Sequence, residues 1–97
     1  WMVTRDEVPN PQALDLWLKV NGQTMQNGNT DTMIFGVKTI VSYLSQCMSL
    51  QPGDVIATGT PPGVGQGMNP PVFLKSGDEV ETSVAGLGTQ KQTVIEP

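Results

Sequence analysis

Gly53-Asp-Val-Ile-Ala-Thr-Gly-Thr-Pro-Pro-Gly-Val-Gly-Gln-Gly67 is the stretch that decides the fold of this 97-residue chain. The apolar run 55–57 is too short for a helix and lies between Pro-Gly and Thr-Gly pairs, so it predicts a short buried strand. The loop that follows is rich in glycine, which permits a positive φ, and in proline, which fixes φ and removes a donor. We therefore expect a restrained loop that presents the hydroxyls of Thr58 and Thr60 to a ligand.

So many glycines first suggest a nucleotide site, but the residues after the loop exclude it. A phosphate-binding loop requires lysine and then serine or threonine after its last glycine, at the start of a helix. Here Met68-Asn-Pro-Pro71 follows instead. The spacing of Gly63, Gly65 and Gly67 does not match the dinucleotide fingerprint either. The pattern alone leaves two alternatives open, a purely structural loop and a small-molecule site.

Upstream of this loop, the sequence predicts a hairpin and then a helix. Leucine and valine alternate with other residues over 14–20, the pattern of a strand, and Asn21-Gly22 favours a type I′ turn that returns 23–26 antiparallel. From Thr30 the apolar spacing becomes helical and continues to Met48, so we expect one main helix there. Thr30 or Asp31 is the expected cap, and a break near Gly36 is an alternative. Cys47 falls on the apolar stripe and is expected to be a small buried residue without thiol reactivity.

A second hairpin is expected after the loop. Residues 72–74 predict a brief bridge and 75–78 a turn, while 79–84 and 90–95 predict two antiparallel strands joined by 85–88. The fold class that follows is α+β, mainly β, with one main helix.

Two groups of carboxylates invite a metal site. Glu79 and Glu81 point the same way on a strand and can approach one hard cation, but two carboxylates without a third ligand form an incomplete cage. A solvated strand face is the simpler interpretation. Asp6 and Glu7, beside Arg5, are interpreted as solvated or capping residues.

Composition excludes several classes of function. The net charge is −4, from nine acidic and five basic residues, and no basic run is present, so neither nucleic acid nor an anionic membrane is an expected partner. No segment approaches the ~20 apolar residues of a membrane span. The absence of histidine removes Ser-His and Cys-His nucleophiles. A single cysteine excludes an intrachain disulfide framework and is compatible with a reducing cytoplasm, where we expect the protein to act.

Gln26, Asn29 and Thr30 form a polar cluster between the first hairpin and the helix. Their short polar side chains are expected to cap backbone groups. A supporting role beside the glycine-rich loop is the alternative.

Several motifs along the chain match those of a known family. They are Val3-Thr4-Arg5-Asp6-Glu7-Val8, Val20-Asn21-Gly22, Gln26, Asn29-Thr30, Met33-Ile34-Phe35, Tyr43-Leu44-Ser45 and Gly53-Asp-Val-Ile-x-Thr-Gly-Thr-Pro-Pro-Gly-Val-Gly65. In these residues the sequence resembles the fumarylacetoacetate hydrolase family in its C-terminal catalytic domain, and the resemblance covers nearly the whole chain. Trp17, Gln26–Thr30 and Pro70-Pro71 are most similar to the bacterial branch named for 2,4-diketo-3-deoxy-L-fuconate hydrolase or ureidoglycolate lyase.

The resemblance implies part of a mixed β-roll, a homodimer and a Mg²⁺ or Mn²⁺ ion that chelates a keto acid while a C–C bond breaks. It implies that Thr60 holds a carboxylate or keto oxygen of the substrate, with Gly59, Pro61 and Gln26 as further substrate-binding candidates. The expected activity is hydrolysis of 2,4-diketo acids of the acylpyruvate type. Isomerisation, hydration, decarboxylation or a lyase reaction on the same fold is the alternative.

The resemblance also implies that the family's metal ligands and active-site lysine lie upstream of the matching segment. Because the chain begins at Trp1, a residue that does not start translation, we expect 1–97 to be the C-terminal part of a single catalytic domain without its metal-binding part. No catalytic residue or metal ligand is assigned within it, and we expect the 97 residues alone to be inactive. A truncated β-domain that serves only in assembly is the rival from another class.

Overall fold

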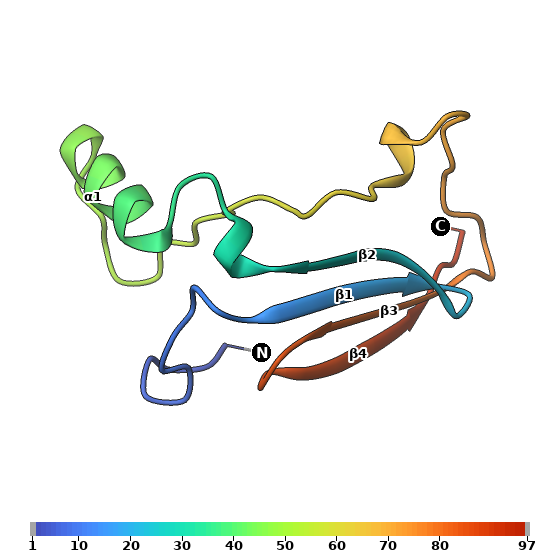
Figure 1. Ribbon diagram of the computed structural model, residues 1–97, viewed down its shortest axis with the longest axis horizontal. Coiled ribbons are helices and arrows are strands. Elements are labelled where there is room, and N and C mark those ends of the chain that lie inside the picture. The colour runs from blue at the N-terminus through green and yellow to red at the C-terminus, as the bar shows by residue number, and fades with distance from the viewer. Residues whose placement is uncertain (1, 97) are drawn as a thin grey trace.

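The computed structural model describes residues 2–96 and contains four strands, one α-helix and two short 3-10 helices. In chain order they are β1 (Asp15–Val20), β2 (Gln23–Asn29), the 3-10 helix η1 (Thr30–Thr32), α1 (Val37–Cys47), the 3-10 helix η2 (Gly65–Gly67), β3 (Glu79–Val84) and β4 (Gly88–Thr93). The predicted α+β class, mainly β with one main helix, is confirmed (Figure 1).

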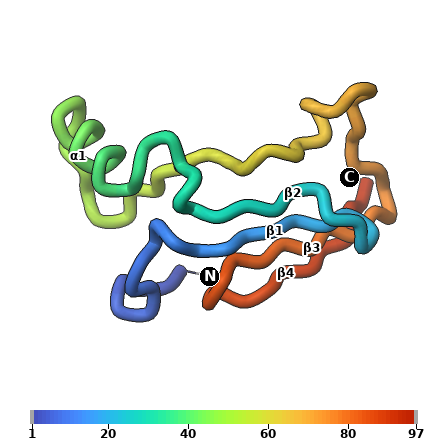
Figure 2. Tube along the Cα trace, viewed as in Figure 1, coloured from blue at the N-terminus to red at the C-terminus, as the bar shows by residue number. Residues whose placement is uncertain are grey.

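The four strands form one antiparallel sheet in the order β2-β1-β3-β4. Both predicted hairpins are present, and the first turns at Asn21 (φ 50°) and Gly22 (φ 79°), the positive values that a type I′ turn requires. The second hairpin starts as predicted at Glu79, but β4 begins two residues earlier than expected, at Gly88. Figure 2 shows the two hairpins lying side by side along β1 and β3.

Asn21 joins the two hairpins. Its main-chain N–H donates to the carbonyl of Glu79 at 2.8 Å, its side-chain carbonyl accepts from the main-chain N–H of Glu79 at 2.9 Å, and its Nδ2 donates to Asp78 at 2.9 Å. Asp78 also accepts from the main-chain N–H of Lys75 at 2.8 Å, which closes the predicted 75–78 turn. The order of strands therefore depends on a turn residue as well as on the apolar pattern of the strands.

The pairing of β1 with β2 contains a β-bulge. Leu18 pairs with Gln26 and Lys19 pairs with Thr24, so Met25 is the extra residue. A bulge increases the local twist and changes the direction in which the next side chains point. The bulge lies directly before Gln26.

The helix is shorter than predicted. Residues 30–32 form η1 instead of its first turn, and α1 begins only after Gly36. The expected caps were wrong, because the side chain of Asn29 caps η1 by accepting from the N–H of Asp31, while Gly36 is the N-cap of α1. The alternative of a break near Gly36 is confirmed. Glycine has a low helix propensity, so the helix does not extend through Gly36 although the apolar spacing continues on both sides of it.

Two predicted β-segments are not strands within the described residues. Residues 55–57 belong to no strand, and Val55 is 92% exposed. Residues 72–74 form no bridge, although the N–H of Val72 donates to the carbonyl of Gly65 at 2.9 Å. Both predictions were wrong because a strand requires a hydrogen-bonding neighbour as well as an apolar sequence.

No residue among 2–96 is fully buried, and the molecule is open. Its radius of gyration is 15.7 Å, whereas a compact domain of this length has about 13 Å. Figure 1 shows α1 beyond the end of the sheet, away from its faces, which leaves the helix without a packed core. The predicted burial of Cys47 was therefore wrong, since the residue is exposed. No helix within the described range has the length and apolar composition needed to cross a membrane.

Candidate functional site

The glycine-rich loop returns along β2 and is held against it at two glycines. Figure 1 shows this segment running back from α1 beside β2. Gly63 has a φ of 112° and approaches the carbonyl of Met25 in the bulge so closely that a Cβ atom would collide with it. A Cβ atom on Gly28 would lie 3.0 Å from Cβ of Pro61. A close backbone approach therefore requires glycine at residue 63, and at residue 28 the Pro61 ring leaves little room for a Cβ atom.

The structure brings together three of the four predicted substrate-site residues. Nε2 of Gln26 donates to Oγ1 of Thr60 at 2.8 Å and to the carbonyl of Pro61 at 2.6 Å. Gln26 lies on β2 and Thr60 lies 34 residues later, so these bonds fix the loop to the sheet. The alternative that Gln26 supports the loop is the one that the geometry favours.

Thr60 and its neighbour Gly59 remain accessible to a ligand. Both are exposed, and no atom lies within 4 Å of the place where Gly59 would carry a Cβ atom. Gly59 has a φ of 111°, a conformation that side chains other than glycine rarely adopt. Thr58 is exposed as well and has no hydrogen bond from its side chain within residues 2–96. The loop therefore presents donor groups to solvent from a restrained backbone.

Asn29 and Thr30 have the capping role predicted for them. Asn29 caps η1, and its Nδ2 donates to Asp15 at 2.7 Å. Oγ1 of Thr30 accepts from the main-chain N–H of Leu14 at 2.9 Å. Neither side chain bonds the glycine-rich loop, so both stabilise the start and end of the β1–β2 hairpin.

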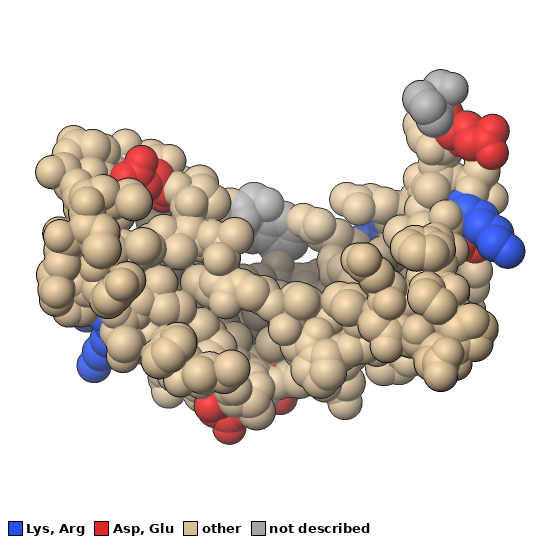
Figure 3. Space-filling view, turned by 90° about the horizontal axis from the view of Figure 1, so that it is seen from above, with Lys and Arg blue, Asp and Glu red and all other residues tan. Residues whose placement is uncertain are grey.

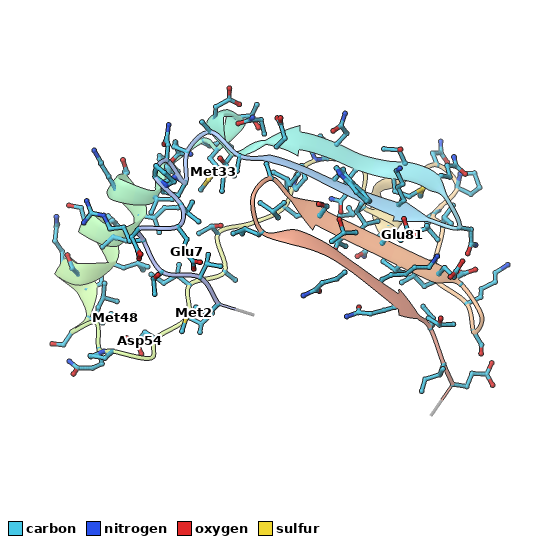
Figure 4. All side chains as sticks on the ribbon, turned by 90° about the horizontal axis from the view of Figure 1, so that it is seen from below. Met2, Glu7, Met33, Met48, Asp54 and Glu81 are labelled. Atoms are coloured by element: carbon cyan, nitrogen blue, oxygen red, sulfur yellow. The ribbon has the colours of Figure 1, made fainter. Side chains whose placement is uncertain are left out.

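Sequence reasoning missed Gln12. Its Nε2 donates to the carbonyl of Thr30 and contacts Sδ of Met33, and its Oε1 accepts from the N–H of Val37 at 2.8 Å. Figure 4 shows Met33 at the junction of the sheet and the helical part of the chain. Gln12 therefore connects the loop before β1 to the first residue of α1. Its place in a loop without periodicity gave no sequence signal for this role.

The described residues do not form a metal site. No three aspartate, glutamate, cysteine or histidine side chains among them gather around one point. Nζ of Lys91 lies 2.9 Å from Glu79 and 3.0 Å from Glu81, and these carboxylates raise the pKa of Lys91, with Glu79 the larger cause. The interpretation of this pair as a solvated strand face, here neutralised by a lysine, is the one that the structure favours. Figure 4 shows Glu7 and Asp54 on the opposite side of the molecule from Glu81.

Charge is scattered over the surface. Figure 3 shows a largely uncharged face with isolated acidic and basic groups near its margins. Asp6 is exposed, and the side-chain hydrogen bond from Thr4 is the main cause that lowers its pKa. These contacts agree with the interpretation of Asp6 as a solvated, locally bonded residue.

An open cavity of about 970 Å³ lies away from the loop. It is lined by residues of the 3–14 segment, by the start of α1 and by Leu87, and most of these are apolar. Neither Thr60 nor Gln26 contributes to its lining. The loop that carries Thr60 and this cavity are thus different places on the chain.

Comparison with known proteins agrees with the resemblance in sequence. The family model described as fumarylacetoacetate hydrolase C-terminal matches residues 1–95. A Burkholderia ambifaria protein, named only as a hydrolase of provisional assignment, is 65% identical over 94 residues, which are 96% of this chain and 33% of that protein. The chain thus spans about a third of the length of the curated relatives it matches.

Three solved structures have the same fold at substantial identity. A fumarylacetoacetate hydrolase from Exiguobacterium antarcticum is 43% identical, with a TM-score of 0.91 over 98% of this chain and 34% of its own. A maleylpyruvate hydrolase from Sphingobium sp. SYK-6, in complex with manganese(II) and pyruvate, is 37% identical, with a TM-score of 0.84 over 98% of this chain and 33% of its own. A 5-carboxymethyl-2-hydroxymuconate delta-isomerase from Mycobacterium smegmatis is 37% identical, with a TM-score of 0.80 over 100% of this chain and 35% of its own. These neighbours confirm the predicted C-terminal fold, and with the matching family model they show that the chain belongs to the fumarylacetoacetate hydrolase family.

Proposed function

We propose that this chain is the C-terminal part of the catalytic domain of a metal-dependent hydrolase that cleaves a C–C bond in 2,4-diketo acids. One observation carries the proposal: the accessible hydroxyl of Thr60 is held in place by Gln26 on a loop that is fixed to the sheet. Members of the family act as hydrolases and isomerases. The maleylpyruvate hydrolase solved with pyruvate supports an acylpyruvate-type substrate.

Thr60 supplies the chemistry that this chain contributes. A hydroxyl proton and nearby main-chain N–H groups are hydrogen-bond donors, and a carboxylate or keto oxygen is an acceptor. Such donors orient a bound keto acid and stabilise negative charge that develops on its oxygen. Gly59 and Pro61 shape the backbone that carries them. In this proposal the chain forms one wall of the substrate site.

The metal is expected to be Mg²⁺ or Mn²⁺, as the manganese complex of the maleylpyruvate hydrolase suggests. Because the described residues do not fit a metal ion, the proposal assigns its ligands to other parts of the intact protein and derives no catalytic step through it from this chain. When bound, such an ion polarises a substrate oxygen as a Lewis acid.

The proposal also covers the setting of the enzyme. Large apolar side chains such as Ile34 (92%) and Phe35 (64%) are exposed, and burial of such surface is the main driving force for packing and association. We infer that they pack against the rest of the catalytic domain or the second subunit of a homodimer. The proposed location is the cytoplasm, and the proposed partner is a small keto acid.

The test measures turnover by the full-length protein with an acylpyruvate and added Mg²⁺ or Mn²⁺. Hydrolysis consumes one water and yields pyruvate and a carboxylic acid, whereas isomerisation yields a product of unchanged mass. Formation of pyruvate supports the hydrolase, an isomer alone supports the isomerase alternative, and no reaction in the presence of either metal contradicts the proposal.

Thr60→Val tests the contact itself. Loss of one donor to a developing oxyanion costs about 100-fold to 1,000-fold in kcat, so we expect activity to fall at least tenfold while metal affinity stays nearly unchanged. Thr93→Val, the same change at an exposed position on β4, is the matched control. An unchanged rate for Thr60→Val removes Thr60 from the site.

A further inference from the structure

We propose that Gln26 is a positioning residue that directs the hydroxyl proton of Thr60 toward the substrate. This inference rests on the proposed function and assigns Gln26 a role through Thr60 in place of direct contact with the keto acid. It starts from the two hydrogen bonds that Gln26 makes across the sheet to the loop.

Both N–H groups of the Gln26 amide are already used. A primary amide has two N–H donors, and here they meet Oγ1 of Thr60 at 2.8 Å and the carbonyl of Pro61 at 2.6 Å. The carbonyl of Pro61 can only accept, so the nitrogen of the amide must be the atom that faces it. A carboxylate or keto oxygen also needs a donor. Gln26 has none left to give, which argues against its direct contact with such a group.

The hydrogen bond from Gln26 determines what the Thr60 hydroxyl can do. Because Oγ1 accepts from Gln26, its single proton must point elsewhere. Oγ1 of Thr60 donates its proton to the carbonyl of Pro61 over 3.5 Å, at the limit of a hydrogen bond, while the same carbonyl accepts the much shorter bond from Gln26. Because this bond is long and exposed, a carboxylate or keto oxygen on the exposed side of the loop can replace the carbonyl as the acceptor of the proton.

The backbone around Gln26 and the loop that packs on it are held in place. The bulge at Met25 comes directly before it in β2, and the close approach of Gly63 to the Met25 carbonyl fixes the loop at that bulge. Gly28, two residues further on the same face, lies against Pro61. Thr60 is β-branched and has few rotamers. The geometry of the donor is thus set before a substrate arrives.

Two substitutions of similar size separate positioning from general support. Gln26→Met removes both donors, and Gln26→Glu additionally supplies a carboxylate that accepts the Thr60 proton and turns it away from the substrate. In the full-length enzyme assayed with an acylpyruvate, we expect the loss of the bond to Thr60 to lower kcat/KM about tenfold in Gln26→Met, and we expect a larger fall for Gln26→Glu. Gln23→Met and Gln23→Glu, at the exposed start of the same strand, should have little effect.

The decisive measurement is a double-mutant cycle with Thr60→Val, accompanied by thermal unfolding of each variant. If Gln26 acts through the Thr60 hydroxyl, adding Gln26→Glu to Thr60→Val lowers kcat/KM by less than about twofold more. Additive losses, or equal losses for Gln26→Met and Gln26→Glu, overturn the positioning role. Failure of the proposed function is distinct, because the wild-type protein then shows no acylpyruvate turnover at all.

Discussion

Gly63 lies against the main-chain carbonyl of Met25, the extra residue of the β-bulge. Gly63→Ala should therefore lower the free energy of unfolding of the full-length protein by about 2–5 kcal/mol, the sum of a backbone collision and an unfavourable φ. Thermal or denaturant unfolding measures this change. Activity should fall too, because the same contact fixes the loop that carries Thr60.

Gly53→Ala is the matched control for this experiment. Gly53 also has a positive φ, 98°, but a Cβ atom there meets nothing within 4 Å. Its substitution should cost only the backbone strain, about 1–2 kcal/mol. Equal losses at residues 53 and 63 would show that the approach to Met25 contributes nothing.

Asn21 should matter more than an ordinary turn residue. Asn21→Ala removes the side-chain bonds to Asp78 and Glu79 and places alanine at a φ of 50°, for an expected loss of about 1–3 kcal/mol in unfolding free energy. Asn21→Gly removes the same bonds but tolerates the positive φ. It should therefore be less destabilising, and a loss confined to the alanine variant would assign the whole effect to the backbone.

Asp78 gives a pH dependence with a definite sign. The hydrogen bond from the Asn21 side chain, then that from the Lys75 main chain, lowers the pKa of Asp78 in the folded protein. The folded state thus binds this proton less tightly than the unfolded state, so the contribution to stability is present above about pH 4 and is lost as the pH falls through the lowered pKa. The difference in unfolding free energy between wild type and Asp78→Ala should be constant from pH 7 to 5 and shrink below pH 4. Asp31→Ala, at an exposed residue of η1, is the control, and a difference that grows in acid would contradict the assignment.

Glu79 and Glu81 should not affect metal activation. Lys91 lies against both carboxylates, and solvent-exposed pairs of this kind contribute little to stability. The double variant Glu79→Gln, Glu81→Gln should retain metal-stimulated turnover within about twofold over a Mn²⁺ titration. If the double variant remains folded but is no longer activated by Mn²⁺, this pair is a metal site.

Local signals predicted the sheet well. Asn21-Gly22 and the alternating residues of β1 were enough to predict the first hairpin, because turn type and strand period depend on residues that are close together in the sequence. The pairing of β1 with β3 was not predicted. It depends on contacts between Asn21 and Glu79, which are far apart in sequence.

The predictions of burial were wrong because they depended on a core. The apolar character of Cys47 and of residues 55–57 predicted burial, yet the described chain supplies no layer that covers them. An apolar side chain is more stable when it is buried, but its sequence does not show which other part of the protein buries it.

The candidate site was predictable in part. The glycine-rich motif indicated Thr58 and Thr60, the family resemblance selected Thr60, and the polar cluster between the first hairpin and the helix included Gln26. The bond between them could not be read from sequence, because it requires the bulge at Met25 and the return of the loop along β2.

The outer edge of β4 has a consequence for solubility. β4 is the last strand of the sheet, and all six of its residues, Gly88–Thr93, are exposed and none is apolar. An open strand edge is a template for pairing with other chains, and a lysine together with polar side chains makes such pairing unfavourable. Within residues 2–96, the polar side chains of β4 and the charge of Lys91 therefore make this strand edge a poor template for aggregation.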